Sequence, residues 1–149
     1  MAFKFGLESV LKHRKRLEDV AQREFVQAQA DVDAALGRLE KMYQRLDEVR
    51  VEISGKETSG GREAIANICE LELFLRGHKV RIESVRLEAR ELLAIAETKQ
   101  EALIHAATEK KVLVKLREKR LAEHRLVLER MEAKIQDDQA MMARAWGKR

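Results

Sequence analysis

The residues with the chemistry most often used in catalysis and metal binding are four histidines and one cysteine. His13, His78, His105 and His124 lie far apart, and no two of them are four residues apart on a helix. A zinc site needs several ligands at short spacings in the sequence. No histidine here has a second histidine or a cysteine near enough to form such a group. Cys69 has no general base beside it in the sequence. The chain therefore predicts no catalytic residue, no metal site and no cofactor.

One further motif, the pair Gly60-Gly61, has a known chemical use elsewhere, because glycine-rich loops can bind phosphate. Such loops follow a strand and open a helix, and no strand pattern precedes this pair. We interpret the pair as part of a turn. Reactive side chains thus predict no site. The pattern of helices is more informative about the fold and the function.

Apolar residues follow a heptad pattern along most of the chain. Alternating steps of four and three residues keep one narrow face of a helix against a partner helix, as in coiled coils. Twelve of the fourteen positions in the first stripe are apolar. This stripe comprises Leu7, Leu11, Arg14, Glu18, Ala21, Phe25, Ala28, Val32, Ala35, Leu39, Met42, Leu46, Val49 and Ile53. A second stripe comprises Ile68, Leu71, Leu75, His78, Ile82, Val85, Ala89, Leu92, Ala96, Lys99, Leu103 and Ala106.

The fold class predicted by these stripes is all-α, with two long helices in an antiparallel coiled-coil hairpin. The chain of 149 residues has no proline and only seven glycines, so little interrupts a helix. We expect a single domain over residues 1–149, with helices at about 5–53 and 62–143 and a loop at about 54–61. The architecture offers no closed pocket, which argues against an enzyme.

The register of this hairpin follows from its loop. A loop centred near Thr58 would place Val10 next to Ala106, and about thirty C-terminal residues would overhang the first helix. From Ala107 onward every second heptad position remains apolar, whereas the positions between them are mostly polar; the apolar positions are Ala107, Val114, Leu121, Leu128, Ile135 and Met142. This half-stripe fits either a frayed helix end or a surface kept for another protein.

Positive charge concentrates at the two ends of the chain, because the basic residues of the otherwise neutral first part cluster at Lys12, Arg14, Lys15 and Arg16. Residues 110–149 carry twelve basic and six acidic side chains, whereas residues 1–60 carry eleven of each. The lone cysteine suits a reducing compartment, and the chain lacks both a long apolar run and a secretory signal pattern. We therefore expect a cytoplasmic protein that is a monomer when alone and that has no small-molecule substrate.

The N-terminal motif of the chain resembles the opening of the flagellar export protein FliJ family. The motif is Phe3-x-Phe5-x-Leu7-x-x-Val10-Leu11-x-x-Arg14-x-x-x-Glu18-x-x-Ala21. The similarity extends to Leu116-x-Glu118-Lys119 and to Glu132-x-x-x-x-Asp137-Asp138-Gln139-Ala140. The family usually has Asp-Glu before this last alanine, so the closing match is the looser one. Chain length and loop position agree as well.

The resemblance implies a component of the flagellar type III export apparatus that is similar to the γ stalk of rotary ATPases. Its partners would be the hexameric export ATPase, the cytoplasmic domain of the membrane export gate and export chaperones. It would lie at the inner membrane at the flagellar base and promote ATPase assembly, ATPase activity and substrate export. The end of the hairpin that carries both termini would enter the ATPase ring.

Two surfaces are candidate contacts with these partners. Carboxylates on the ATPase would attract the basic end of the hairpin, which contains Lys12, Arg14, Lys15, Arg16, Lys110, Lys111, Lys115, Arg117, Lys119 and Arg120. The resemblance places the export-gate contact nearer the loop, in a part of the second helix where Leu71, Leu73, Phe74 and Leu75 are too many for one stripe. These apolar side chains fit either a partner contact or local packing. The candidate gate residues are Leu73, Phe74, Leu75 and His78.

Alternatives remain open for individual residues and for the function. Arg14 and Glu18 can pair with each other on one helix, mark a frayed end or set the register. A structural or chaperone-like coiled-coil adaptor is the first alternative function. A basic coiled coil that binds nucleic acid is the second, although acidic residues are mixed through its basic segment.

Overall fold

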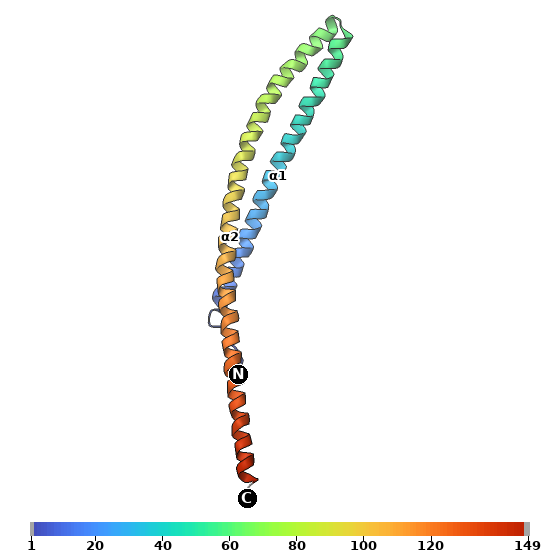
Figure 1. Cartoon of the computed structure of the whole chain (residues 1–149). Coiled ribbons are helices and arrows are strands. Elements are labelled where there is room, and N and C mark those ends of the chain that lie inside the picture. The colour runs from blue at the N-terminus through green and yellow to red at the C-terminus, as the bar shows by residue number, and fades with distance from the viewer. Residues whose placement is uncertain (1, 148–149) are drawn as a thin grey trace. The chain divides into compact units, whose positions relative to one another are not determined.

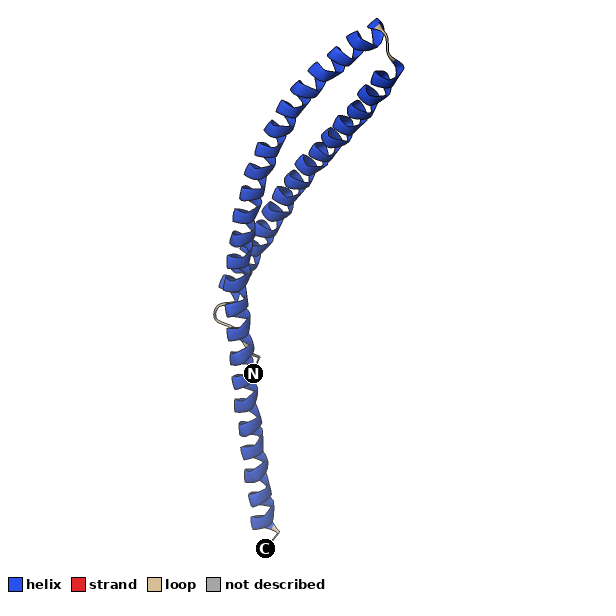
Figure 2. Ribbon diagram, turned by 45° about the horizontal axis from the view of Figure 1, so that its top comes forward, coloured by secondary structure: helices blue, strands red, loops and turns tan. Residues whose placement is uncertain are grey.

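The computed structural model describes residues 2–147, and two long helices account for most of them. Helix α1 spans Glu8–Ser59 and helix α2 spans Arg62–Trp146 (Figure 1). Within residues 2–147 the structure has no strand, and its non-helical segments are the N-terminal residues, the turn between the helices and Gly147 (Figure 2). The predicted all-α fold with two long helices is confirmed.

The turn is shorter than the loop expected from the sequence. Helix α1 continues through the segment 54–59, and only Gly60 and Gly61 have positive φ angles, of 65° and 107°. The Thr58 hydroxyl donates to the backbone carbonyl of Gly55 at 2.8 Å, so this polar side chain is satisfied inside the helix. Two glycines are sufficient for the reversal because they adopt the left-handed conformation without steric cost.

Contacts divide the chain into two compact units. The first combines the residues up to Asp19 with those from Ile104 onward, and the second is Val20–Leu103. Each unit contains one segment of α1 and one of α2. Each is described separately below.

In the second unit the two helix segments run antiparallel. Lys99 on α2 forms an ion pair with Glu24 on α1 at 3.1 Å, and Glu88 accepts a hydrogen bond from Arg38 at 2.8 Å. Ala28, Val32 and Ala96 form a buried cluster against which Leu92 packs. Small side chains at this position allow the helices to approach closely, so the core is a narrow stripe and not a globular centre.

Burial follows the predicted heptad positions residue by residue. All fourteen positions of the first stripe and all twelve of the second are buried or half-buried. The neighbours of these positions are mostly exposed, even where they are large and apolar, as at Leu36 and Leu87. Periodicity therefore identified the packed face of each helix.

In the first unit α2 is covered only in part. Leu121, His124 and Leu128 are half-buried, whereas residues 129–147 are all exposed. The helix nevertheless continues to Trp146, three residues beyond its expected end. The predicted half-stripe is therefore half-buried as far as Leu128, and only its last two positions, Ile135 and Met142, lie on the segment that is exposed throughout.

The predicted contact between Val10 and Ala106 is wrong. Val10 lines an open groove with Val112 and Leu113, six and seven residues further along α2. The expected loop centre at Thr58 was too early, because the reversal occurs at Gly60 and Gly61. Moving the centre of an antiparallel hairpin by one residue moves the facing position by two, which explains most of the difference.

Candidate functional site

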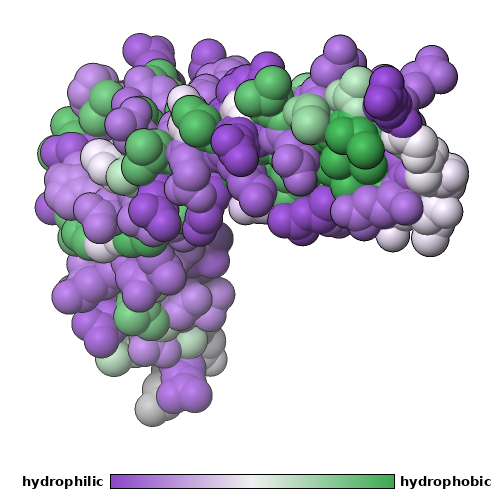
Figure 3. Space-filling view, turned by 90° about the horizontal axis from the view of Figure 1, so that it is seen from above, coloured by the Kyte–Doolittle hydropathy of each residue, from purple (hydrophilic) through white to green (hydrophobic). Residues whose placement is uncertain are grey.

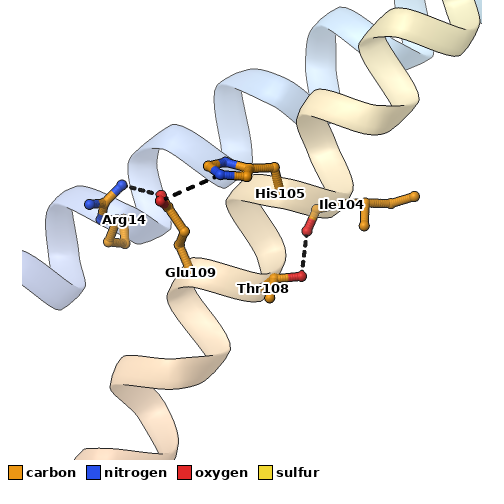
Figure 4. Close-up of polar contacts among 5 residues, drawn as sticks. All are labelled: Arg14, Ile104, His105, Thr108 and Glu109. Carbon is orange, nitrogen blue, oxygen red and sulfur yellow. Dashed lines mark hydrogen bonds and ion pairs between the residues drawn. The ribbon is translucent and has the colours of Figure 1, made fainter.

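The basic residues proposed for ATPase contact come from two chain segments that the first unit brings together. Arg14 on α1 forms an ion pair with Glu109 on α2, and Glu18 on α1 pairs with Lys110 (Figure 4 shows the first pair). Arg117 forms a third cross-helix pair with Glu8 at 3.2 Å. Basic residues from both ends of the sequence therefore occupy one region of this unit.

The cross-helix pairs correct the interpretation of Arg14 and Glu18. These two residues lie four positions apart on α1, but each pairs with α2 and not with the other. Both lie on the packed face, where a polar residue needs a partner on the facing helix. Figure 4 also shows His105 on the other side of the Glu109 carboxylate, with its Nε2 atom 3.7 Å away. The arrangement supports a role of Arg14 and Glu18 in setting the register.

The ten candidate basic residues differ in what they contact. Arg14, Lys110 and Arg117 are in ion pairs, and the Arg120 guanidinium lies 5.7 Å from the centre of the Phe5 ring. The other six are exposed and form no ion pair among residues 2–147; they are Lys12, Lys15, Arg16, Lys111, Lys115 and Lys119. Of the ten candidates, only these six present their charge to solvent without an internal partner.

Three of the exposed lysines form a stripe. Lys111, Lys115 and Lys119 are spaced by four residues on α2, so they lie on one face of the helix. This face is distinct from the packed one, which contains Lys110, Val114 and Leu121. We call Lys111, Lys115 and Lys119 the lysine stripe.

The N-terminal phenylalanines have a structural role that the sequence analysis missed. Residues 2–7 are not helical and lie along α2, where Phe5 is only 8% exposed beneath Arg120. The Phe3 ring meets the edge of His124, with the ring centroids 5.6 Å apart. These residues cover the half-stripe of α2 just beyond the start of α1. Two phenylalanines two residues apart were the available signal, but their partner on α2 could not be inferred.

The candidate gate residues in the second unit are mostly engaged within the protein. His78 is buried, and its Nε2 atom lies 2.7 Å from the backbone carbonyl oxygen of Met42. Phe74 is half-buried and stacks on His78, with Arg45 and Arg81 each 5.6 Å from its ring centre. Phe74 is therefore engaged within the hairpin and is not a freely exposed apolar side chain.

Leu73 and Leu75 have different environments. Leu75 is half-buried on the packed face, whereas Leu73 is 68% exposed. Of the four candidate gate residues, Leu73 alone offers a largely free apolar side chain. Val80, 70% exposed, lies seven residues further along the same face of α2.

Other kinds of site find little support in the described residues. Residues 2–147 contain no group of three histidine, cysteine, aspartate or glutamate side chains placed to hold a metal ion. In the same range no helix is both long enough and apolar enough to cross a membrane. On the face shown in Figure 3, apolar side chains are scattered in patches among hydrophilic ones. Extended helix surfaces, and not enclosed pockets, are the candidate functional features.

Two long helices joined by a tight turn, with charged and apolar side chains on open helix faces, define an all-α helical protein. The family model described as "Flagellar FliJ protein" matches residues 3–148, so the chain belongs to the FliJ family. As a member of this family it is a component of the flagellar export apparatus. No curated protein sequence and no solved structure matches the chain.

Proposed function

We propose that this protein binds the hexameric export ATPase through its first unit and promotes ATPase assembly and activity. The observation that supports this most directly is the lysine stripe, which lies in the same unit as the exposed basic residues of α1. Charges without an internal partner attract an acidic surface over a distance and accelerate encounter with it. The exposed end of the half-stripe, Ile135 and Met142, would then supply apolar contact together with the neighbouring Met131.

We further propose that the protein has no catalytic activity of its own and acts by binding. A protein that binds an assembled ring better than its separate subunits favours the ring by mass action. The purified protein should hydrolyse no ATP, yet increase hexamer formation or turnover by the cognate ATPase. If neither the assembly nor the turnover of that ATPase changes, the proposal fails.

Reversal of the lysine stripe tests the proposed ATPase contact. The variant Lys111→Glu/Lys115→Glu/Lys119→Glu changes the charge by six units and leaves the internal ion pairs of Arg14, Lys110 and Arg117 in place. We expect strongly weakened ATPase binding and a flatter salt dependence, with unchanged helical circular dichroism.

The matched control carries the same charge change in the second unit. It is Lys41→Glu/Arg62→Glu/Lys79→Glu, in which all three positions are exposed. This control should bind the ATPase nearly as well as the unmodified protein. An equal loss of binding in both variants would mean that net charge alone matters and would refute a contact at the lysine stripe.

We propose that the export gate contacts the second unit at Leu73. Phe74, Leu75 and His78 support this surface from inside, since their side chains are engaged in the hairpin. Leu73→Ser should weaken binding to the cytoplasmic domain of the gate and spare ATPase binding. Leu36→Ser, at a 49% exposed leucine on α1, is the control. The protein would act in the cytoplasm, peripherally at the inner membrane, with export chaperones as further partners.

A further inference from the structure

A second heptad pattern runs along α2 on the face opposite to the packed one. It starts at Leu73 and continues in steps of four and three residues, and all of its positions are exposed. We call it the outer stripe; it comprises Leu73, Gly77, Val80, Ser84, Leu87, Glu91, Ala94 and Thr98. Its three large aliphatic residues recur every seven residues and are 68%, 70% and 57% exposed. This is the spacing by which one helix packs against another.

The outer stripe has room for a second helix. A side-chain carbon added at Gly77 would meet no atom within 4 Å, and Ser84 is also small. Small residues between Leu73, Val80 and Leu87 would let another helix approach closely. All positions of the outer stripe lie in the second unit.

Charges alternate along one flank of the outer stripe. The residues that precede its small or polar positions are Arg76, Glu83, Arg90 and Glu97, spaced by seven. Among residues 2–147, Arg76, Arg90 and Glu97 form no ion pair, and Glu83 has only an exposed pair with Arg86 on its own helix. These side chains are available to a partner.

The alternation selects one partner and one orientation. We infer that the outer stripe binds the outer stripe of a second copy of this chain in antiparallel orientation. In an antiparallel pair of helices, residues on the same flank face each other. The two-fold axis lies between Val85 and Arg86 for the positions of the outer stripe itself. On the flank, the nearest residue of the second copy is then Glu97 for Arg76 and Arg90 for Glu83. Every facing pair on this flank then has opposite charges.

The other flank agrees with the same register. Arg81 would face the second copy's Glu88, and Phe74 would face its Ile95. Glu88 already binds Arg38 on α1 at 2.8 Å, so this flank contributes less than the first. Apolar contacts would come from Leu73, Val80 and Leu87.

A parallel pair in register is disfavoured by the same charges. In that arrangement each flank faces the opposite flank of the partner. Arg76 would face Arg81, and Glu83 would face Glu88, so like charges would meet. Polar positions at Glu91 and Thr98 keep the antiparallel association weak and reversible, so the monomer expected from the sequence would be in equilibrium with the dimer. Because Leu73 also belongs to the proposed gate contact, self-association competes with gate binding.

Sedimentation equilibrium of the full chain without partners tests this inference, from about 10 μM to about 1 mM. We expect a concentration-dependent dimer that disappears in Leu73→Ser/Val80→Ser/Leu87→Ser and persists in the control Leu36→Ser. Circular dichroism should show unchanged helicity in both variants, since all four residues are exposed. A monomer throughout this range, or a dimer that survives the triple substitution, would overturn the inference.

Charge exchange tests the register. Arg76→Glu should weaken the dimer at least several-fold, because it faces Glu97 of the second copy. Arg76→Glu/Glu97→Arg should restore the dimer, whereas Arg76→Glu/Glu83→Arg should not. If the first double variant stays as weak as the single one, the antiparallel register is refuted. Since no ATPase or gate takes part, these outcomes are independent of the proposed function.

Discussion

The Nε2 atom of His78 on α2 lies 2.7 Å from the backbone carbonyl oxygen of Met42 on α1. His78 is the buried polar residue of the described core, and Phe74 stacks on its ring. Because the carbonyl oxygen can only accept, Nε2 carries the hydrogen and donates the hydrogen bond. A side chain on one helix thus binds the backbone of the other at one defined position, and this contact helps to fix how the two segments of the second unit align.

Replacing this histidine should destabilise the protein. His78→Ala removes a cross-helix hydrogen bond and leaves a gap beneath Phe74, so we expect a loss of about 1–3 kcal/mol in the free energy of unfolding. Urea denaturation followed by circular dichroism measures it. Lys79→Ala, at the exposed neighbouring position, should change stability by less than about 0.5 kcal/mol. Equal effects of the two substitutions would contradict the importance of this contact.

The cross-helix pair of Arg14 and Glu109 should be recoverable by exchange of its charges. Arg14→Glu places two carboxylates together, so we expect a loss of up to about 1 kcal/mol, in line with partly exposed ion pairs. Arg14→Glu/Glu109→Arg should recover most of this loss. A double-mutant cycle in urea measures the coupling. Independent, additive effects would indicate that the pair does not contribute to stability.

The register of the first unit predicts distances between spin labels. Labels at Val10→Cys and Val112→Cys, with Cys69→Ser in the background, should lie about 10–20 Å apart, the scale of neighbouring helices plus label arms. Both valines are exposed and line one groove. Labels at Val10→Cys and Ile104→Cys, the comparison pair, should lie further apart. The reverse order of the two distances would return the register to the one expected from a loop at Thr58.

Two glycines near the turn should respond to alanine in opposite ways. Gly61 has a φ of 107°, which alanine adopts only under strain, so Gly61→Ala should destabilise the protein by about 1 kcal/mol or more. Gly55 is helical, and a side-chain carbon there meets no atom within 4 Å. Gly55→Ala should therefore stabilise by about 0.5–1 kcal/mol. Thermal unfolding compares the stability of the two variants. A change of melting temperature in the same direction for both would refute the assignment of Gly61 to the turn and of Gly55 to the helix.

The N-terminal segment should protect the part of α2 that it covers. Phe5→Ala removes the largely buried ring beneath Arg120, and we expect a loss of about 1–3 kcal/mol, since the ring is covered from one side only. Hydrogen exchange should become faster in α2 around residues 117–128. Lys4→Ala, at an exposed position, is the control and should leave exchange unchanged. Unchanged exchange after Phe5→Ala would show that the segment does not protect α2.

The sequence by itself determined which face of each helix is packed. The heptad spacing from Leu7 to Ile53 and from Ile68 to Ala106 predicted buried positions, and every one of them is buried or half-buried. The reason is local, because the turn of an α-helix alone decides which residues share a face. The family followed from the N-terminal motif for a similar reason, since a motif is a property of neighbouring residues.

The tertiary structure decided which atoms meet across the helices. The heptad pattern repeats every seven residues, so a slip of one heptad would preserve the stripes and change every cross-helix partner. The turn at Gly60 and Gly61, together with the cross-helix contacts themselves, selects the register that joins Arg14 to Glu109 and His78 to Met42. The buried position of Phe5 was also decided by the tertiary structure. Phe5 lies in a non-helical segment, which has no periodicity from which its partner on α2 could be predicted.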